Sequence, residues 1–213
     1  MLGRLNGLRT SLFAAIPTLF RGQSNLLGPN YASMSATHSG PVEVATFASG
    51  CFWGTEHIFL KKFPPAQDKG ILKTTVGYTG GKAENPTYRQ VCGGDTEHAE
   101  AVRIEFDPTK VPYETLVEYF FCTHDPTHVN RQGPDVGTQY RSAIFYNSDE
   151  QKVLAENVKA DVQEKHFKGK QIATQIVPAG EWYNAEDYHQ KYLINNPSGY
   201  ECPTHHEHWA FQV

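Results

Sequence analysis

Sulfur-containing residues are scarce in this 213-residue chain, which has four cysteines and two methionines. The cysteines, Cys51, Cys92, Cys122 and Cys202, lie far apart and form no CxxC pair. A chain of this length buries about 70% of the surface that its unfolded form exposes, so it folds without disulfide crosslinks. So few cysteines argue against a disulfide scaffold and favour functional or simply buried thiols.

Basic charge is not in excess either, because 19 Lys and Arg against 23 Asp and Glu give a formal net charge of −4. The sequence has no basic stripe, the usual mark of a nucleic-acid-binding surface. No apolar run approaches the about 20 residues that a membrane-spanning helix needs. We therefore expect no nucleic-acid partner and no membrane partner. Internal repeats and low-complexity segments are also absent.

Acidic residues are missing from the start of the chain, since the first of them is Glu43. The segment before it contains three Arg residues and several Ser and Thr residues. This composition is typical of a mitochondrial transit peptide. A secretory signal is the alternative, because residues 11–20 are mostly apolar, but Pro17 and Arg21 interrupt that run. A disordered extension without a targeting function is the third interpretation.

The chain is predicted to have three parts. Residues 1–40 form a targeting peptide or a disordered extension, and the protein is mitochondrial; a second start at Met34 would give a cytosolic form. Residues 41–193 form the catalytic domain. Residues 194–213 form an irregular tail that carries Cys202 and several Gly, Pro and His residues.

Apolar runs and capping residues predict alternating strands and helices in the central part. The clearest helix is residues 112–122, whose apolar side chains recur with helical spacing behind Pro112. A long loop at residues 124–139 is of the kind that often carries function. The order of elements predicts an α+β fold, a two-layer sandwich: a mixed sheet with a ferredoxin-like core, helices packed on it and an irregular C-terminal tail. Strands are predicted at 42–48, 71–78, 98–106, 140–146 and 172–177, and helices at 51–62, from 85, at 112–122, 148–167 and 185–193.

A scarce cysteine and a scarce tryptophan come together in Gly50-Cys51-Phe52-Trp53-Gly54, between the first predicted strand and helix. A thiol at a helix N-terminus meets the positive end of the dipole and free N–H groups, so we expect Cys51 to have a lowered pKa and a reactive thiolate. The two glycines are interpreted as room for a backbone or a substrate. The alternative is a buried, inert cysteine beside core aromatics.

The strand predicted at residues 98–106 carries a carboxylate on its apolar face. Side chains alternate along a strand, so Glu100 points the same way as Val102, Ile104 and Phe106. Burial keeps a carboxyl group protonated, and a neutral carboxylic acid can donate a proton to a substrate. The alternative is that Glu100, near the strand end, turns to water or pairs with a cation.

These residues resemble the peptide methionine sulfoxide reductase family of the A type. The resemblance covers residues 42–202 and implies an enzyme that reduces the S epimer of methionine sulfoxide, free or in proteins. It also implies no metal and no organic cofactor. Besides the stretch around Cys51, it rests on further segments in the same order: Val76–Gly81, Asn85–Tyr88, Gly94–Val102, His124–Thr127 and Asp135–Ser142.

The resemblance further implies a role for each site residue. Cys51 would attack the sulfoxide sulfur and become a sulfenic acid, which Cys202 would resolve as a Cys51–Cys202 disulfide. Glu100 would protonate the sulfoxide oxygen. Thioredoxin or a small dithiol would reduce the disulfide, and we expect a monomer. Tyr88 and Tyr140 would donate their hydroxyls to the same oxygen. Asp135 would order a polar network or water, and Phe52 with Trp53 would form a pocket for the S-methyl group.

Other interpretations stay open at this point. Taken singly, Tyr88 and Tyr140 are also typical of tyrosines with one wet end, and Asp135 of a turn residue. A hydrolase or acyltransferase with Cys51 and the base His57 is disfavoured, because residues six apart on one helix lie on different faces. A zinc-binding or structural tail is the remaining rival, with Cys202, His205, His206 and His208 as possible ligands. It is disfavoured because no second Cys/His pair at suitable spacing completes a structural zinc site.

Overall fold

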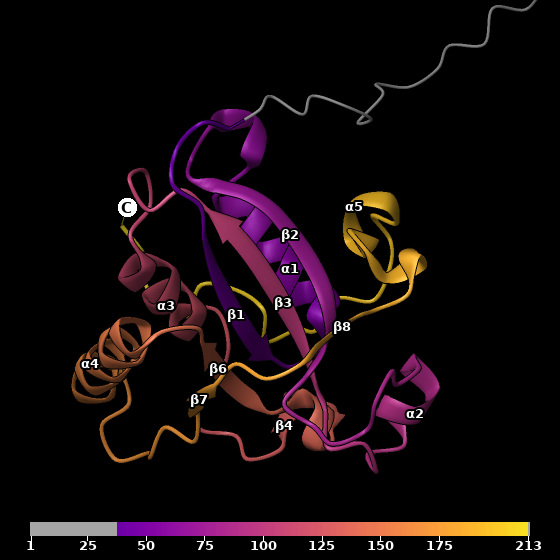
Figure 1. Ribbon diagram of the computed structural model, residues 1–213. Coiled ribbons are helices and arrows are strands. Elements are labelled where there is room, and N and C mark those ends of the chain that lie inside the picture. The colour runs from indigo at the N-terminus through magenta and orange to yellow at the C-terminus, as the bar shows by residue number, and fades with distance from the viewer. Residues whose placement is uncertain (1–37, 213) are drawn as a thin grey trace, which may run out of the picture. The chain divides into compact units, whose positions relative to one another are not determined.

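The structure is a computed structural model that describes residues 38–212. The predicted targeting segment, with Met34, lies outside the described residues except for its last three positions. Six strands form one sheet in the order β7-β6-β1-β3-β2-β8 (Figure 1). These strands are β1 (Glu43–Ser49), β2 (Ile71–Thr79), β3 (Ala99–Phe106), β6 (Ser142–Tyr146), β7 (Gln175–Pro178) and β8 (Trp182–Asn184).

The helices connect these strands or follow them. They are α1 (Phe52–Lys62), α2 (Tyr88–Cys92), α3 (Tyr113–Cys122), α4 (Asp149–His166) and α5 (Tyr192–Asn195). Short 3₁₀ turns lie at Pro65–Gln67, Thr138–Tyr140 and Asp187–His189. A separate hairpin, β4 (Arg131–Gln132) and β5 (Asp135–Val136), lies within the loop predicted at residues 124–139.

The centre of the fold is a ferredoxin-like unit. Its elements follow the chain as β1, α1, β2, β3, α3 and β6, and its strands lie in the order β2-β3-β1-β6 with every neighbouring pair antiparallel. Strand β7 then adds parallel to β6, which makes the sheet mixed. The predicted α+β class, the mixed sheet and the ferredoxin-like core are therefore confirmed.

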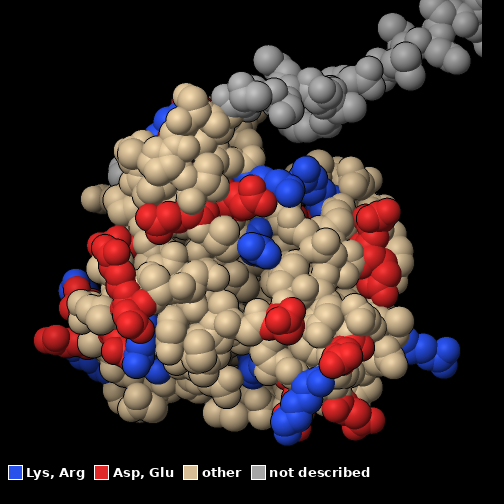
Figure 2. All heavy atoms as spheres, in the orientation of Figure 1, with Lys and Arg blue, Asp and Glu red and all other residues tan. Residues whose placement is uncertain are grey.

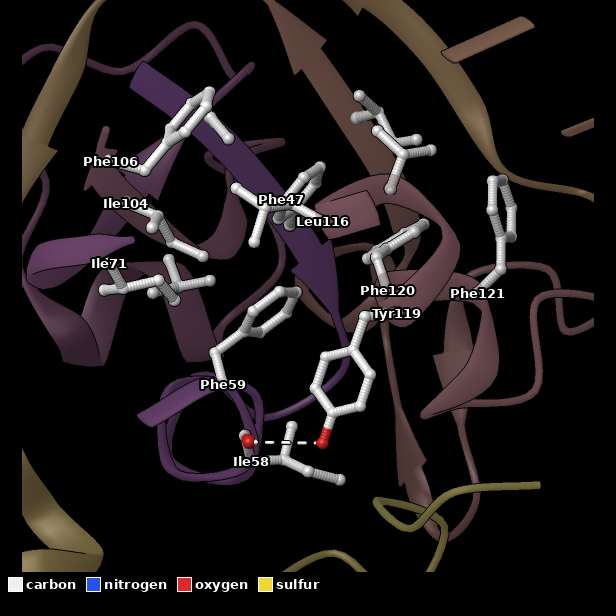
Figure 3. Close-up of a cluster of buried hydrophobic side chains, with 14 of the residues drawn as sticks. Phe47, Ile58, Phe59, Ile71, Ile104, Phe106, Leu116, Tyr119, Phe120 and Phe121 are labelled. Atoms are coloured by element: carbon white, nitrogen blue, oxygen red, sulfur yellow. Dashed lines mark hydrogen bonds between the residues drawn. The ribbon is translucent and has the colours of Figure 1, made fainter. Parts of the chain in front are cut away.

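One face of the sheet packs against helices α1, α3 and α4 in a single apolar cluster. Figure 3 shows side chains of this cluster from the sheet, α1 and α3. The ring of Phe47 on β1 stacks on Phe59 of α1 at 5.5 Å and on Phe120 of α3 at 5.1 Å, centroid to centroid. The Tyr119 hydroxyl donates to the Ile58 carbonyl at 3.3 Å and ties α3 to α1. These contacts hold α1, and the residue that begins it, firmly on the sheet.

Strand β3 shows the predicted alternation of faces. Val102 and Ile104 belong to the helix-covered cluster, whereas Ala99 and Ala101 belong to a smaller cluster on the opposite face. Glu100 therefore enters the helix-covered side at the end of the strand. It lies where β3 passes the start of α1, because the Phe52 N–H reaches its carboxylate.

The prediction of a helix at residues 185–193 is wrong. The chain forms the edge strand β8, a 3₁₀ turn, a left-handed residue at Lys191 with φ 52°, and the single turn α5. The Gln190 side chain accepts from the Val76 N–H and donates to the Val76 carbonyl, both at 2.9 Å. These hydrogen bonds to β2 replace the backbone hydrogen bonds that a helix would make. The local sequence pattern does not predict them, because β2 is distant in the sequence.

The start of α2 is also different from the prediction. Pro86 is not in its first turn, because Thr87 begins the helix with a capping box in which its hydroxyl accepts from the Gln90 N–H. Pro112 is likewise the residue before α3 and not its first member. These differences move the start of the first helix by three residues and that of the second by one, and leave both elements in place.

The tail is irregular, as predicted, and it is packed on the domain. The His208 N–H donates to the Cys122 carbonyl at 2.8 Å, the Cys122 thiol donates to the Trp209 carbonyl at 3.4 Å, and Phe211 joins the core cluster. No helix among residues 38–212 is long and apolar enough to cross a membrane. The face in Figure 2 carries acidic and basic side chains in small separate groups.

Candidate active site

Cys51 lies at the turn between β1 and α1, where the sequence predicts it. It is the N-cap residue of α1, and Gly50 before it has a φ of 98°, a conformation that side chains disfavour. Cys51 is 8% exposed, so only a small part of it is open to the surface. The Phe52 N–H, in the first turn of α1, donates to Glu100 Oε2 at 3.1 Å. The predicted nucleophile and the predicted acid therefore meet at one helix terminus.

The predicted low pKa of the Cys51 thiol is wrong. Burial raises this pKa well above its ordinary value, and the charges of Glu100 and Asp135 raise it further. The N–H groups of Trp53 and Gly54 do lower it, as a helix N-terminus should. Loss of hydration is the larger effect, because it penalises the charged thiolate in a nearly closed site. Cys51 is therefore a protonated thiol in the resting site.

Glu100 has the environment that the strand pattern predicts. It is 1% exposed, and burial raises its pKa from 4.5 to about 8. The hydrogen bond from Phe52 acts in the opposite direction, while the Asp135 charge adds to the rise. Among the described residues no cation pairs with this carboxyl group, so it carries its proton at pH 7.

The glycines beside Cys51 make room for the protein's own side chains. A Cβ atom on Gly50 would lie 2.6 Å from Gln132 Cβ, and one on Gly54 would overlap His205 Nδ1. Gln132 belongs to β4, and His205 belongs to the tail. The glycines do permit a close approach, and the groups that approach are side chains from later segments of the chain rather than the predicted backbone.

Tyr88, the first residue of α2, and Tyr140, the last residue of a 3₁₀ turn, both lie near the Glu100 carboxyl group. Burial raises the pKa of both hydroxyls well above the ordinary value, and the Glu100 charge raises each further. For Tyr88, a hydrogen bond with Cys92 adds to the rise. Both phenols therefore stay protonated and able to donate at any physiological pH. The Tyr88 N–H donates to Glu186 Oε1 at 2.9 Å and fixes the start of α2.

Asp135 on β5 lies near both predicted redox cysteines, because its charge acts on both thiols. Its carboxylate accepts the Tyr200 hydroxyl at 3.0 and 3.1 Å, through Oδ1 and Oδ2. Cys202 is 1% exposed, and its Sγ lies 3.2 Å from Thr204 Oγ1. Burial raises the pKa of Cys202, and the Asp135 charge raises the pKa of both Cys51 and Cys202. The tail thus folds back toward Cys51 with both thiols free.

The two predicted pocket aromatics differ in exposure. Phe52 is 1% exposed and belongs to the core, whereas Trp53 is half-buried and presents part of its ring to the surface. The Trp53 indole N–H donates to His189 Nδ1 at 3.0 Å. The ring of Tyr192 stacks on the indole with 3.7 Å between centroids. Trp53 is therefore held rigidly at the edge of the site, with Phe52 behind it.

A thiol, a protonated carboxyl group, two phenols and a clamped indole are thus gathered at one helix terminus. A family model described as peptide methionine sulfoxide reductase matches residues 43–211 of the chain. The chain belongs to the peptide methionine sulfoxide reductase family. This confirms the resemblance seen in the sequence, and the enzyme is an oxidoreductase that acts on methionine sulfoxide.

Related proteins cover most of this reductase. A probable peptide methionine sulfoxide reductase of Schizosaccharomyces pombe is 53% identical over 168 residues, which are 79% of this chain and 98% of the relative. The peptide methionine sulfoxide reductase MsrA of Methanosarcina acetivorans is 54% identical, with 71% of this chain and 78% of the relative covered. Reduced Mxr1 of Saccharomyces cerevisiae superposes with a TM-score of 0.73 at 42% identity, covering 78% of this chain and 92% of Mxr1.

The sequence interpretation misses several residues of the reductase site. Glu186 accepts from the Tyr78 hydroxyl at 2.8 Å and from the Tyr88 N–H, and His189 and Tyr192 clamp Trp53. Residues 186–192 hold acidic, aromatic and His residues close together, a composition that points to a functional segment. The prediction of one helix there does not use that composition. Tyr200 stands two residues before Cys202, and that position was the signal for it.

The rival interpretations find no support in the structure of this reductase. Among residues 38–212 no three His, Cys, Asp or Glu side chains are gathered so that they could hold a metal ion. The tail imidazoles bind backbone carbonyls instead, those of Ser49, Pro203 and Thr204. As for a hydrolase, the buried Nδ1 of His57 has no hydrogen-bond partner in the described part of the chain, so this atom does not engage the Cys51 thiol.

Proposed function

We propose that Cys51 is the nucleophile of this reductase and that Glu100 is the acid that protonates the sulfoxide oxygen of the S epimer. The observation that carries this assignment is the meeting of a helix-capping thiol with a buried, protonated carboxyl group. A sulfoxide oxygen is a poor leaving group until it gains a proton. The site therefore offers sulfur attack on one side and proton donation on the other.

The raised pKa values of both groups fit one sequence of events. A neutral Glu100 removes the negative charge that would oppose a Cys51 thiolate. The Trp53 and Gly54 N–H groups then stabilise the thiolate as it attacks the sulfur. Glu100 gives its proton to the sulfoxide oxygen, the sulfur–oxygen bond of the substrate breaks, and methionine leaves. The oxygen ends on Cys51 as a sulfenic acid, and the proton that the Cys51 thiol gave up returns the Glu100 carboxylate to its acid form. The net reaction consumes one thiol and one sulfoxide and needs no further oxidant or reductant.

The other predicted residues have supporting roles in this proposal. The Tyr88 and Tyr140 hydroxyls, which stay protonated, donate hydrogen bonds to the same oxygen. Trp53 provides a flat apolar wall for the S-methyl group, with Phe52 supporting it from the core. Asp135 orders the polar side of the site through Tyr200. The chemistry needs neither a metal nor an organic cofactor, and it serves free methionine sulfoxide and oxidised proteins alike.

The proposal assigns Cys202 as the resolving cysteine. Its thiol condenses with the Cys51 sulfenic acid, so that a disulfide forms and water leaves. A dithiol then reduces the disulfide by exchange. Mxr1 of Saccharomyces cerevisiae has been solved in complex with Trx2, and that structure superposes with a TM-score of 0.53 at 27% identity, covering 81% of this chain and 96% of Mxr1. We therefore propose thioredoxin as the reductant of this monomeric enzyme.

Replacing Cys202 with serine tests the assignment of the two cysteines. Turnover of a methionine-S-sulfoxide peptide with dithiothreitol should stay within about threefold of wild type, because a small dithiol reaches the sulfenic acid directly. Turnover with thioredoxin should fall by at least about tenfold, because no intramolecular disulfide forms for exchange. Cys92→Ser is the matched control: the serine hydroxyl can keep the hydrogen bond with Tyr88, so this variant should behave as wild type with both reductants. Full thioredoxin-supported turnover in Cys202→Ser would show that another thiol resolves the intermediate.

We further propose that the N-terminal segment directs the protein to mitochondria. The support is its content of Arg, Ser and Thr without acidic residues. A fluorescent fusion of the full chain should colocalise with a mitochondrial marker, and a fusion that starts at Met34 should stay diffuse in the cytosol. Entry of the full-length fusion into the secretory pathway would favour the alternative interpretation of residues 11–20.

A further inference from the structure

His205 joins the resolving-cysteine loop to the turn that carries Cys51. Its Nε2 lies 2.7 Å from the Ser49 carbonyl oxygen, at the end of β1. Its backbone N–H donates to the Cys202 carbonyl at 3.0 Å, which closes the loop between the two residues. The Nδ1 edge of the ring lies against Gly54, where a Cβ atom would overlap Nδ1. One side chain therefore contacts both ends of the Gly50–Gly54 stretch.

The hydrogen bonding sets the protonation of the ring. A carbonyl oxygen only accepts, so Nε2 carries the proton and Nδ1 keeps its lone pair. Nδ1 is buried and has no hydrogen-bond partner among the described residues. His205 is 6% exposed, and burial lowers its pKa, which keeps the ring neutral. A neutral ring whose one N–H donates to a backbone carbonyl suits a fastening role.

The tail is held on both sides of His205. On the C-terminal side, His208 and Trp209 are bonded to Cys122, and Phe211 is in the core. On the N-terminal side, Cys202 is buried and the Tyr200 hydroxyl donates to Asp135. His205 stands three residues after Cys202 and bonds this part of the tail to the end of β1.

We propose that His205 is a positioning residue for the resolving step: it keeps the Cys202 loop at the Cys51 turn so that the Cys202 sulfur reaches the sulfenic acid. The inference rests on the proposed roles of Cys51 and Cys202. In that step the Cys51–oxygen bond breaks and the sulfur–sulfur bond forms. The thiol proton of Cys202 leaves with the oxygen as water, so no other reagent enters. Fastening the loop raises the effective concentration of one sulfur at the other.

The test compares His205→Ala, His205→Gln and His206→Ala. In a single turnover with one equivalent of sulfoxide, wild type should lose two free thiols and give little dimedone adduct on Cys51. His205→Ala should form the disulfide at least about tenfold more slowly and accumulate the adduct, because a misplaced thiol reacts poorly. His205→Gln, whose amide N–H can still donate to the Ser49 carbonyl, should recover most of the rate. His206→Ala changes the exposed neighbouring imidazole and should match wild type.

Turnover with dithiothreitol separates positioning from folding. His205→Ala should keep dithiothreitol-supported turnover within about twofold of wild type while thioredoxin-supported turnover falls at least about tenfold. Disulfide formation at the wild-type rate would overturn the proposal, and so would an equal loss with both reductants. Both results leave the roles of Cys51 and Cys202 standing. Those roles fail separately if Cys51→Ser stays active or if Cys202→Ser still closes an intramolecular disulfide with another cysteine.

Discussion

Cys51→Ser is expected to lower methionine sulfoxide reduction by at least about 10³-fold with either dithiothreitol or thioredoxin. The reaction leaves the substrate oxygen on the sulfur of Cys51, and a serine hydroxyl cannot take that place. A hydroxyl also stays protonated at neutral pH, so the N–H groups of Trp53 and Gly54 have no anion to stabilise. The substitution removes little volume from a residue that is 8% exposed, so the fold should remain.

A single turnover without reductant gives the sharpest measurement. Wild type should release one methionine per chain and then stop as the Cys51–Cys202 disulfide, whereas Cys51→Ser should release none. Methionine is measured by chromatography, with the S and R epimers supplied separately. Cys92→Ser serves as the control for loss of a thiol near the site, and it should release one methionine as wild type does. Substantial methionine release by Cys51→Ser would remove the central assignment.

The parts of the fold that local periodicity sets could be predicted from the sequence. The helical stripe of α3 and the alternation along β3 are local patterns, and both are present in the structure. The alternation alone predicts that Glu100 lies on the buried face, because side chains of a strand point to one face of the sheet or the other. The junction of β1 with α1 at Cys51 was equally local. The positions of the proposed nucleophile and acid could therefore both be predicted from local patterns.

The features that could not be predicted depend on contacts between distant segments. The pKa of Cys51 is set by burial beneath later parts of the chain, and a helix N-terminus alone suggests the opposite shift. The sequence suggests open space beside Gly54, but the His205 side chain fills that space. The helix expected at residues 185–193 gives way because Gln190 bonds to the backbone of β2, far away in sequence. Local composition contains none of these contacts.

Glu100→Gln is expected to lose activity by about 10²- to 10⁴-fold, because an amide cannot transfer a proton to the sulfoxide oxygen. In wild type the rate should fall as pH rises through about 8, where Glu100 loses its proton. That loss also restores the negative charge that opposes the Cys51 thiolate. The variant should show no such alkaline decline in its residual rate. Initial rates from pH 6 to 9.5 with saturating sulfoxide measure both effects.

Although Glu100→Gln should lower activity, it should raise the stability of the fold at high pH. The folded pKa of Glu100, about 8, lies above the ordinary 4.5, so this carboxyl group favours folding most at low pH. Its contribution is lost as pH rises from 4.5 through 8, because the folded protein must then hold a buried anion. The amide that replaces the carboxyl group stays neutral, and its oxygen can still accept from the Phe52 N–H. At pH 9, Glu100→Gln should therefore be more stable than wild type by on the order of 4 kcal/mol.

Denaturant unfolding at pH 5 and pH 9 measures this difference, and Glu105→Gln is the matched control. Glu105 lies on the same strand but on the other face, 3.4 Å from the Lys73 ammonium at the surface. Its loss should change stability by about 1 kcal/mol or less and leave activity unchanged. If wild type and Glu100→Gln respond to pH in parallel, Glu100 is not a buried acid. A variant that is inactive and more stable at pH 9 would show that the buried carboxyl group destabilises the fold at alkaline pH and serves the reaction.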